Sequence, residues 1–423
     1  MIQTFSISSG VTLRVYHDSR FKEGCMSLQL VRPMCREEAA KNALLSAVLL
    51  RGSEHYPDLQ AITWRLDELY GASVGTLVRR VGDWQTTGLY CSFLEDRFAL
   101  PGDKILEPAV ALLKELLLCP KLEGGVFSRD FVESEKRNLV LAIEAQRNDK
   151  RAWCSAQLIK NMCREDSFGV PRLGEIEDVK AITPEGLYEH YRRILKESRM
   201  EIFYVGSADP RQVQKLCQNM VGILERDYVN LPPQTAFVSS GGGAWEEAMD
   251  IAQGKLSMGF VTGATIRDGK PFVATQMMNL IFGGGMTSKL FTQVREKMSL
   301  CYAIGSGYHG SKGILTVNAG MDCEKKDTVR RQVLAQLDAI RSGEITAEEL
   351  DAARQAMLST LRATHDSPGS IENYYANAAL SGLPYSPEEY MQAAMEITAD
   401  DVAQAARQVK LHSEYFLKGE TPC

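Results

Sequence analysis

FGGGMTSKLFTQVREKMSLCYAIGSGY, from Phe282 to Tyr308, combines three local signals in one short stretch. The three glycines indicate a tight turn, LFTQVREK has the pattern of an amphipathic helix, and the residues that follow alternate as a strand does. A similar order of amphipathic segment and strand, TWRLDELYGASVGTLV, stands at 63–78 in the first half of the chain. The stretch therefore suggests that one structural unit occurs twice.

Further pairs of segments support a duplication. Strand-like MSLQLV at Met26–Val31 corresponds to LSMGFVTG at 256–263, and each is followed by an apolar helix, ALLSAVLLRGS in one case and ATQMMNLIFGGG in the other. A second strand follows in each half, TGLYCSFL or GILTVNAGM, and then two long helical patterns. The closing helices begin alike, with Thr183 and Thr398 as the expected N-caps. Six matches in the same order indicate duplicated domains.

The clearest break between the halves is NLPPQTAFVSSGGGAWE at 230–246, where Pro, Ser and Gly interrupt the periodic pattern. We therefore predict an N-terminal domain at 1–229, a linker at 230–246 and a C-terminal domain at 247–423. Strands that alternate with long helices predict an α+β fold, in which each domain is a mostly antiparallel sheet backed by long helices. Two unrelated α/β domains are the alternative.

The composition narrows the class of protein. The 423 residues are 44% hydrophobic and 24% charged, which is typical of a globular chain with more than one core. Because the net charge is −6 and Lys and Arg are scattered, we expect no nucleic-acid partner. We find neither a secretory signal nor a run of the roughly 18 apolar residues that a membrane helix needs, so we expect a cytoplasmic location and no membrane partner. The ten dispersed cysteines are expected to be free thiols.

The segment Phe282–Tyr308 closely resembles the C-terminal signature of the pitrilysin/insulinase (inverzincin) peptidase family, in which an Arg precedes a Tyr by seven positions. Here those residues are Arg295 and Tyr302. The duplication resembles the LuxS/metallopeptidase-like architecture of that family, and SSGVTLRVY near the N-terminus is similar to its opening hairpin. The resemblance implies that Arg295 and Tyr302 bind substrate, by donating hydrogen bonds to carbonyl oxygens of an extended peptide.

Active members of that family carry H-x-x-E-H on the first long helix, with two His as zinc ligands and the Glu as general base. Aligned on the turn Arg51–Ser53, the five motif positions run from Ala43 to Ala47 and read ALLSA. The family's third ligand, a Glu on a later helix, corresponds to Ile143, and the neighbouring Glu144 is rotated by about 100° around the helix. We therefore predict that this chain has no metal ligand, no catalytic residue and no cofactor.

Other residues that could indicate a site have simpler structural explanations. His55 ends R-G-S-E-H, one residue type away from the zinc motif, but it follows the turn and supplies a single His. The remaining histidines are isolated in the sequence, and we interpret them as surface or satisfied core residues. No GK[ST] follows Gly283–Gly285, so these glycines are interpreted as a helix-ending turn. Ser46 is interpreted as a packing residue, because no nucleophile elbow surrounds it.

Family members without zinc ligands usually stand beside a partner that has them, in mitochondrial processing complexes or in bacterial two-subunit peptidases. This chain resembles the half-size bacterial kind, in particular the zinc-less members associated by label with elongation factor P modification, although no modification chemistry follows from its residues. The resemblance implies a non-catalytic subunit that is inactive alone, binds extended peptides and pairs with a homologous peptidase subunit that holds the zinc. The alternatives are a peptide-binding scaffold without a peptidase partner, a self-assembling structural homologue like the core subunits of respiratory complexes, and, for the chain alone, a homodimer.

Overall fold

The computed structural model describes residues 2–231, 237–239 and 241–419, which divide into two compact units. Unit 1 contains Met1–Ile143, Val170–Pro233 and His365–Asn377, and unit 2 contains Glu144–Gly169, Gln234–Thr364 and Ala378–Cys423. These units differ from two continuous domains at 1–229 and 247–423, because each includes a segment from the other half of the sequence. Part of the predicted linker, residues 232–236 and 240, lies outside the described residues.

The two units contain sheets of matching topology. The unit 1 sheet has the order β1 (Ile2–Ser8), β2 (Val11–His17), β8 (Arg199–Gly206), β3 (Glu23–Pro33), β5 (Trp84–Leu94) and β4 (Ser73–Val81). The unit 2 sheet has the order β9 (Ala244–Met249), β13 (Lys410–Gly419), β10 (Gly254–Val261), β12 (Ile314–Met321) and β11 (Ala303–His309). The strand order of the unit 2 sheet repeats the order β2-β8-β3-β5-β4 of the unit 1 sheet. The parallel pair also corresponds, since β9 is parallel to β13 in unit 2 and β2 is parallel to β8 in unit 1. The predicted duplication and α+β class are confirmed.

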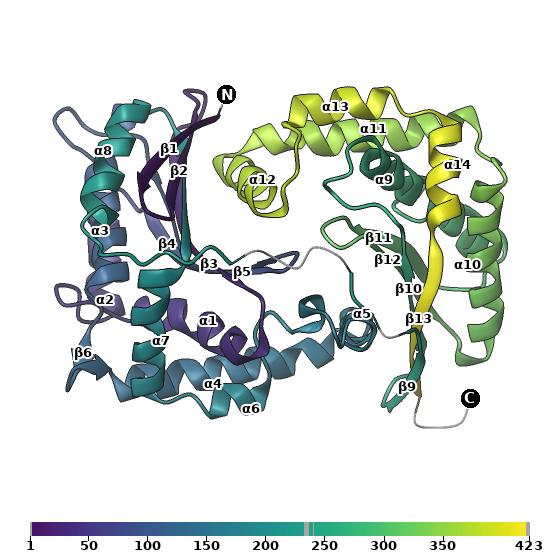
Figure 1. Ribbon diagram of the computed structural model, residues 1–423, viewed down its shortest axis with the longest axis horizontal. Coiled ribbons are helices and arrows are strands. Elements are labelled where there is room, and N and C mark those ends of the chain that lie inside the picture. Colours follow the sequence, from purple (N-terminus) through teal and green to yellow (C-terminus); the bar gives the residue numbers. More distant parts are fainter. Residues whose placement is uncertain (1, 232–236, 240, 420–423) are drawn as a thin grey trace. The chain divides into compact units, whose positions relative to one another are not determined.

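The helices also repeat between the units (Figure 1). Those of unit 1 are α1 (Arg36–Leu49), α2 (Leu59–Glu68), α3 (Leu106–Leu118), α4 (Arg129–Ala145), α6 (Ile176–Lys180), α7 (Pro184–Glu197) and α8 (Pro210–Val221). Those of unit 2 are α5 (Lys150–Met162), α9 (Lys270–Phe282), the π-helix η4 (Leu290–Lys297), α10 (Lys326–Arg341), α11 (Ala347–Ala363), α13 (Pro387–Met395) and α14 (Ala399–Gln408). Both expected N-caps are confirmed, since Thr183 and Thr398 each accept a backbone N–H at the start of α7 and α14.

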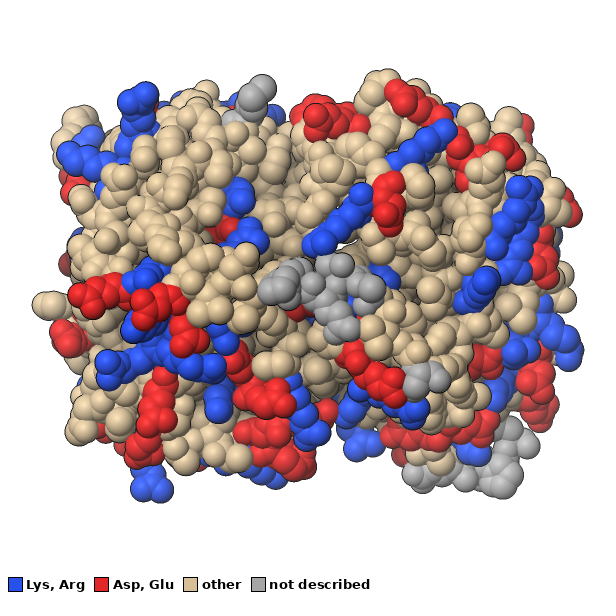
Figure 2. All heavy atoms as spheres, in the orientation of Figure 1, with Lys and Arg blue, Asp and Glu red and all other residues tan. Residues whose placement is uncertain are grey.

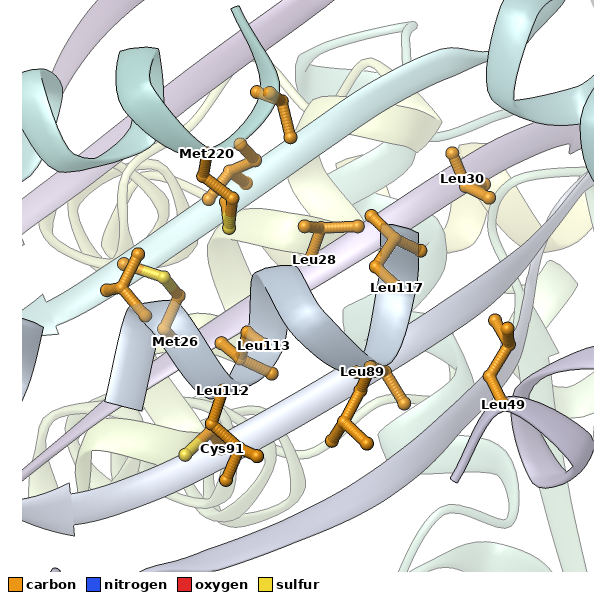
Figure 3. Packing of buried hydrophobic residues seen from close by; sticks show 14 of the residues in the cluster. Met26, Leu28, Leu30, Leu49, Leu89, Cys91, Leu112, Leu113, Leu117 and Met220 are labelled. Carbon is orange, nitrogen blue, oxygen red and sulfur yellow. The ribbon is translucent and has the colours of Figure 1, made fainter. Parts of the chain in front are cut away.

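Strand β3 shows how the sequence determines the core of unit 1. Its side chains are almost all buried, because β8 and β5 flank it and both faces of the sheet are covered. Met26, Leu28 and Leu30 share one face and belong to one core cluster with α3, and Figure 3 shows Met26 near Leu113 and Leu28 near Leu117. The opposite face carries Cys25, Ser27 and Gln29, which face residues 365–377 instead. Burial on both faces accounts for the nearly continuous run of apolar and small residues.

Two helical segments each join the unit that is formed mainly by the other half of the sequence, and they occupy equivalent places in the two units. Helix α5 follows α4 and packs on β10 and β13 of unit 2, where Cys154 and Leu158 join the core. A Cβ added to Gly259 of β10 would lie 2.6 Å from the Met162 sulfur, so a larger residue at this position would require the Met162 side chain to move. Helix α12 (Pro368–Ser381) follows α11, and its Ile371 packs with Cys25 of unit 1. Apolar stripes on α5 and α12 predict burial, but the sheet that buries each is formed by the other half of the sequence.

Charge is mixed over the part of the surface that Figure 2 shows. Lys and Arg side chains alternate there with Asp, Glu and uncharged residues, and no continuous basic area crosses this face. Within the described ranges, no helix combines the length and the apolar character needed to cross a membrane.

Candidate functional site

The glycine turn of the signature joins α9 to η4 in unit 2. The N–H groups of Gly283 and Gly284 both donate to the carbonyl of Asn279, which ends α9. The carbonyl of Gly283 then accepts the N–H of Ser306 in β11 at 2.8 Å. A Cβ added to Gly283 would lie 2.8 Å from that same nitrogen, so only glycine allows the turn to lie against the strand. The turn thus fixes η4 beside the start of β11.

Arg295 projects from η4 and is exposed. Its guanidinium carbon lies 4.4 Å from the centre of the Phe291 ring, one helical turn earlier, which is a favourable cation–π distance. In the part of the chain that the structure describes, no acceptor takes a hydrogen bond from this guanidinium. The ring therefore holds the side chain in place while its N–H donors remain available to a bound molecule.

Tyr302 stands immediately before β11, one residue short of the strand on which the sequence places it. Its side chain is 55% exposed, and its backbone N–H donates to Gly320 of the neighbouring β12 at 2.8 Å. The hydroxyl donates to Oδ1 of Asp322 at 2.6 Å, and the other carboxylate oxygen lies 2.9 Å from Nζ of Lys325. The hydrogen bond to Asp322 raises the pKa of Tyr302, and Lys325 and then Tyr302 lower the pKa of Asp322. The phenol proton therefore stays on Tyr302.

The structure brings the two predicted residues to one small region of unit 2. Cys301 precedes Tyr302, and the positive charges of Arg295 and Lys325 both act on its thiol. Burial outweighs those charges and raises the pKa of Cys301 to about 11, so the thiol stays protonated at neutral pH. The sequence analysis found Arg295 and Tyr302 but missed Phe291, Asp322 and Lys325. The signal available for Asp322 was its place as the first residue after the strand that pairs with the Tyr302 segment.

The positions of the zinc motif belong to the packed core of unit 1. Ala43, Leu44 and Leu45 of α1 are buried, and Ile143 at the end of α4 packs against the same core. Glu144 is exposed. None of the aligned side chains offers a nitrogen, sulfur or carboxylate donor, so these residues do not fit a zinc ion. Within the described ranges, no three His, Cys, Asp or Glu side chains are placed to hold a metal together.

His55 has a structural role in the loop that follows α1, where it contacts Glu115 of α3. Its Nδ1 lies 2.9 Å from Oε1 of Glu115 on α3, and its backbone N–H donates to the same oxygen at 3.0 Å. The hydrogen bond and charge of Glu115 raise the pKa of His55, whose side chain is otherwise exposed. This pair fastens the loop after α1 to α3.

A buried polar network holds α1 on its other side. Asn42 donates to Gln85 of β5 at 2.9 Å, and its side-chain oxygen lies 2.7 Å from Nε2 of His190 on α7. The other ring nitrogen of His190 lies 3.0 Å from Arg193, which also donates to Glu38. A neutral His190 satisfies both contacts, donating to Asn42 and accepting from Arg193. Hydrogen bonds of neutral His190 and Asn42, together with the ion pair of Arg193 and Glu38, therefore hold α1 in place. This is the helix on which active family members carry the zinc ligands.

This network predicts a pH-dependent stability. Burial lowers the pKa of His190 to about 4 from an ordinary 6.5. His190 binds a proton more readily in the unfolded chain than in the folded one. Its contribution to the free energy of unfolding is therefore complete above pH 6.5 and is lost as the pH falls toward 4. We expect unit 1 to lose about 2–3 kcal/mol over this interval. Urea unfolding at pH 7 and pH 4.5 measures this loss of stability. The loss should be smaller in His190→Gln. An equal loss in that variant would show that other groups cause the pH dependence.

The comparisons with known proteins agree with this geometry. Residues 181–357 match the family model described as "Peptidase M16 inactive domain". The "Probable inactive metalloprotease YmfF" of Bacillus subtilis (strain 168) is 29% identical over 417 residues, which cover 97% of this chain and 96% of that protein. The chain is a homologue of the M16 peptidases. The resemblance predicted from the Arg/Tyr signature and the duplication is therefore confirmed.

Solved structures place this M16 homologue in the same fold. A conserved protein from Enterococcus faecalis V583 has a TM-score of 0.92 and 26% identity, with 100% of this chain and 99% of that chain covered. A "peptidase M16 inactive domain" from Pseudomonas fluorescens has a TM-score of 0.83 at 19% identity, with the same coverage. A second B. subtilis protein, "Uncharacterized zinc protease YmfH", is 24% identical over 294 residues, 66% of each chain. The family match and the likeness to YmfF, together with the missing zinc donors, support an inactive homologue.

The first test of inactivity concerns the metal. We expect the purified M16 homologue to contain no stoichiometric zinc and to cleave no peptide, because Ala43, Ala47 and Ile143 have no donor atoms. Metal analysis after exposure to zinc and dialysis measures the content. One zinc per chain that disappears in His55→Ala would contradict the prediction and make His55 a ligand.

Proposed function

We propose that this M16 homologue is the non-catalytic, peptide-binding subunit of a two-chain zinc peptidase. The observation that carries the proposal is the contrast between its two sites. The aligned positions on α1 and α4 provide no zinc ligand, whereas Arg295 on η4 and Tyr302 just before β11 are both exposed residues. The proposal assigns hydrolysis to a partner and part of the peptide binding to this chain.

The position of β11 supports an extended peptide as the bound molecule. This strand is at one edge of the unit 2 sheet, and Tyr302 immediately precedes it. Edge strands bind extended peptides because both present backbone N–H and C=O groups. The N–H of Ser306 is already taken by Gly283, so the peptide would bind near the Tyr302 end of the strand. Arg295 adds donors at that same end.

The relatives support a partner that resembles this chain. B. subtilis (strain 168) has both the "Probable inactive metalloprotease YmfF" and the "Uncharacterized zinc protease YmfH", and both are similar to this chain. A zinc-bearing M16 homologue is therefore the proposed partner, with the zinc in that subunit only. The proposed location is the cytoplasm, in keeping with the free cysteines of the described ranges.

The proposal predicts the effect of removing either side chain. When the chain is mixed with a zinc-bearing M16 homologue from the same organism, Arg295→Ala or Tyr302→Phe should lower peptide turnover about 10²–10³-fold, the usual effect of losing a group that contacts the reacting peptide. Assembly with the partner and the partner's zinc content should not change, because neither residue is proposed to contact the metal. Turnover, complex formation and zinc content are measured on the same mixtures.

Lys297→Ala is the matched control, since it removes a positive charge from the same π-helix, two residues beyond Arg295. We expect turnover within about twofold of the wild type, as for an exposed charge with little contribution. If Arg295→Ala and Tyr302→Phe assemble and turn over peptide like Lys297→Ala, the signature serves the fold and the chain is a scaffold.

A further inference from the structure

The two faces of β3 in unit 1 differ in character. Met26, Leu28 and Leu30 on one face belong to the large apolar cluster that includes α3. Ser27 and Gln29 on the other face are equally buried but polar, and both donate to the segment 365–377, which we call the strap. Burying polar groups has a cost that their hydrogen bonds must offset, so a permanently buried face is usually apolar. The face under the strap is therefore suited to contact with water as well as to burial.

Part of the hydrogen-bonding capacity of this polar face is not used by the protein. The amide nitrogen of Gln29 donates to Glu372 at 3.1 Å, but its Oε1 has no hydrogen-bond partner among the described residues. Thr86 of β5 pairs with Val31 and so lies on the same face, and its buried Oγ1 also has no partner within the described ranges. Such atoms are less costly where water reaches them. They favour an arrangement in which this face is open to solvent.

The apolar contacts that hold the strap against unit 1 are few. Ile371 of α12 forms a cluster of three buried residues with Cys25 and Val205. The strongest polar contact is the ion pair of Glu372, whose two carboxylate oxygens lie 3.0 and 2.9 Å from the Nη groups of Arg79. Segments with few buried apolar contacts open at a lower free energy than the domain to which they belong. The strap therefore depends mainly on one ion pair.

We propose that the strap opens as one piece from an otherwise folded unit 1, and that the ion pair of Glu372 and Arg79 holds it closed. The backbone changes direction at both ends of the helix that carries it. The 3₁₀ turn η6 (Thr364–Asp366) separates α11 from α12, and Gly382 follows α12 with a φ of 77°, in the left-handed region. Opening exposes the polar face of β3 to water. This conformational change is independent of the peptide-binding function proposed above.

Two native cysteines on neighbouring strands report the opening. Cys25 of β3 lies under the strap, whereas Cys91 of β5 belongs to the apolar cluster on the opposite face. Both are 0% exposed, and burial raises the pKa of each thiol to about 12. Opening of the strap exposes Cys25 alone, whereas unfolding of unit 1 exposes both.

The labelling rate of each thiol is measured on the full-length chain with excess N-ethylmaleimide, by mass spectrometry of the peptides. We expect Cys25 to be labelled at least about tenfold faster than Cys91, because local opening requires less free energy than unfolding. Urea should accelerate the labelling of Cys25 less than that of Cys91, since opening exposes less surface.

Two variants separate opening of the strap from unfolding of unit 1. Glu372→Gln removes the charge of the ion pair and should accelerate labelling of Cys25 about 10–100-fold, the effect of losing hydrogen bonds to a charged group. Val110→Ala, in the apolar cluster on α3, should accelerate labelling of Cys91 about tenfold and leave Cys25 unchanged, because that cluster stays packed when the strap opens. Glu68→Gln, in an exposed ion pair, is the control and should change neither rate.

Two results would overturn the inference. Equal labelling rates of Cys25 and Cys91 in the wild type, or an equal acceleration of both by Val110→Ala, would show that Cys25 is reached only when unit 1 unfolds. Fast labelling of Cys25 that Glu372→Gln leaves unchanged would assign its exposure to the end of β3 instead of the strap. If either variant fails to fold, the urea dependence of the two rates in the wild type decides: parallel dependences would contradict a separate opening.

Discussion

Replacing Glu372 with alanine is expected to lower the free energy of unfolding of unit 1 by about 3–5 kcal/mol, the usual effect of breaking a buried ion pair. Glu372 lies on α12, in a segment that joins unit 1 from the far end of the sequence. Its side chain is fully buried and receives both Nη groups of Arg79, at 3.0 and 2.9 Å. Removing the carboxylate leaves the guanidinium, itself only 23% exposed, without its counter-charge.

Two strand residues add to the effect of losing Glu372. The hydroxyl of Ser27 donates to Oε1 at 2.6 Å, and the amide of Gln29 donates to the same oxygen at 3.1 Å. Both side chains are buried on β3, so the variant leaves the Ser27 hydroxyl without this acceptor and leaves the Gln29 amide with its bond to the Ser27 oxygen at 3.2 Å. Hydrogen exchange should therefore rise in β3 and in residues 368–377 together, which localises the change to this contact.

Glu68→Ala is the matched control for Glu372→Ala. Glu68 also pairs with an arginine, Arg65 at 2.8 Å, but its side chain is 65% exposed. Solvent screens such pairs, so the expected change is below about 1 kcal/mol. Urea unfolding followed by circular dichroism compares the two variants. If Glu372→Ala lowers the free energy of unfolding no more than Glu68→Ala does, the buried ion pair of Glu372 and Arg79 does not stabilise unit 1, which would contradict our account.

Asp166→Ala is expected to have an effect of similar size in unit 2, again about 3–5 kcal/mol. Asp166 follows α5, and its Oδ2 lies 3.0 Å from Nζ of Lys312 in the turn between β11 and β12. Both side chains are fully buried. Asp166 also accepts the backbone N–H groups of Phe168 and Val238, at 2.8 and 2.9 Å. Its loss thus leaves one buried ammonium and two backbone donors without this carboxylate.

A double-mutant cycle separates the charge pair from the backbone contacts of Asp166. Asp166→Asn keeps an acceptor oxygen but removes the charge, and Lys312→Met removes the ammonium at similar volume. Because either single change leaves one charged group without its partner, the double variant should lose less stability than the sum of the two single variants. Additive losses in urea unfolding would show that Asp166 and Lys312 do not act as a pair.

The order of elements was predictable because it depends on local signals. Apolar periodicity identified the strands and helices, and the N-caps at Thr183 and Thr398 fixed where α7 and α14 begin. The exchange of α5 and α12 between the halves was not predictable. An apolar stripe such as Cys154 and Leu158 shows that a helix face is buried, but it does not identify the sheet that buries it.

Polar contacts between distant segments could not be predicted either, because a local sequence pattern does not identify a partner far away in the chain. In the sequence GSIENYY, Glu372 looks like an ordinary surface charge, and Arg79 stands almost 300 residues away in a strand. The site was partly visible, since the spacing of Arg295 and Tyr302 carried the resemblance. Asp322 became visible through the pairing of β11 with β12, which sets Ala303 opposite Gly320 and so brings the following residues to Tyr302. The π-helical bonding of η4 has no signal in LFTQVREK, whose apolar positions also fit an α-helix.

The central claim is that this M16 homologue supplies peptide binding to a partner that supplies hydrolysis. The most direct measurement is peptide cleavage by three samples at equal concentration: this chain alone, a zinc-bearing M16 homologue from the same organism alone, and the two mixed. We predict no cleavage by this chain, little by the partner and strong cleavage by the mixture, abolished by a zinc chelator. Cleavage by this chain alone, or a mixture no faster than the partner, would contradict the claim.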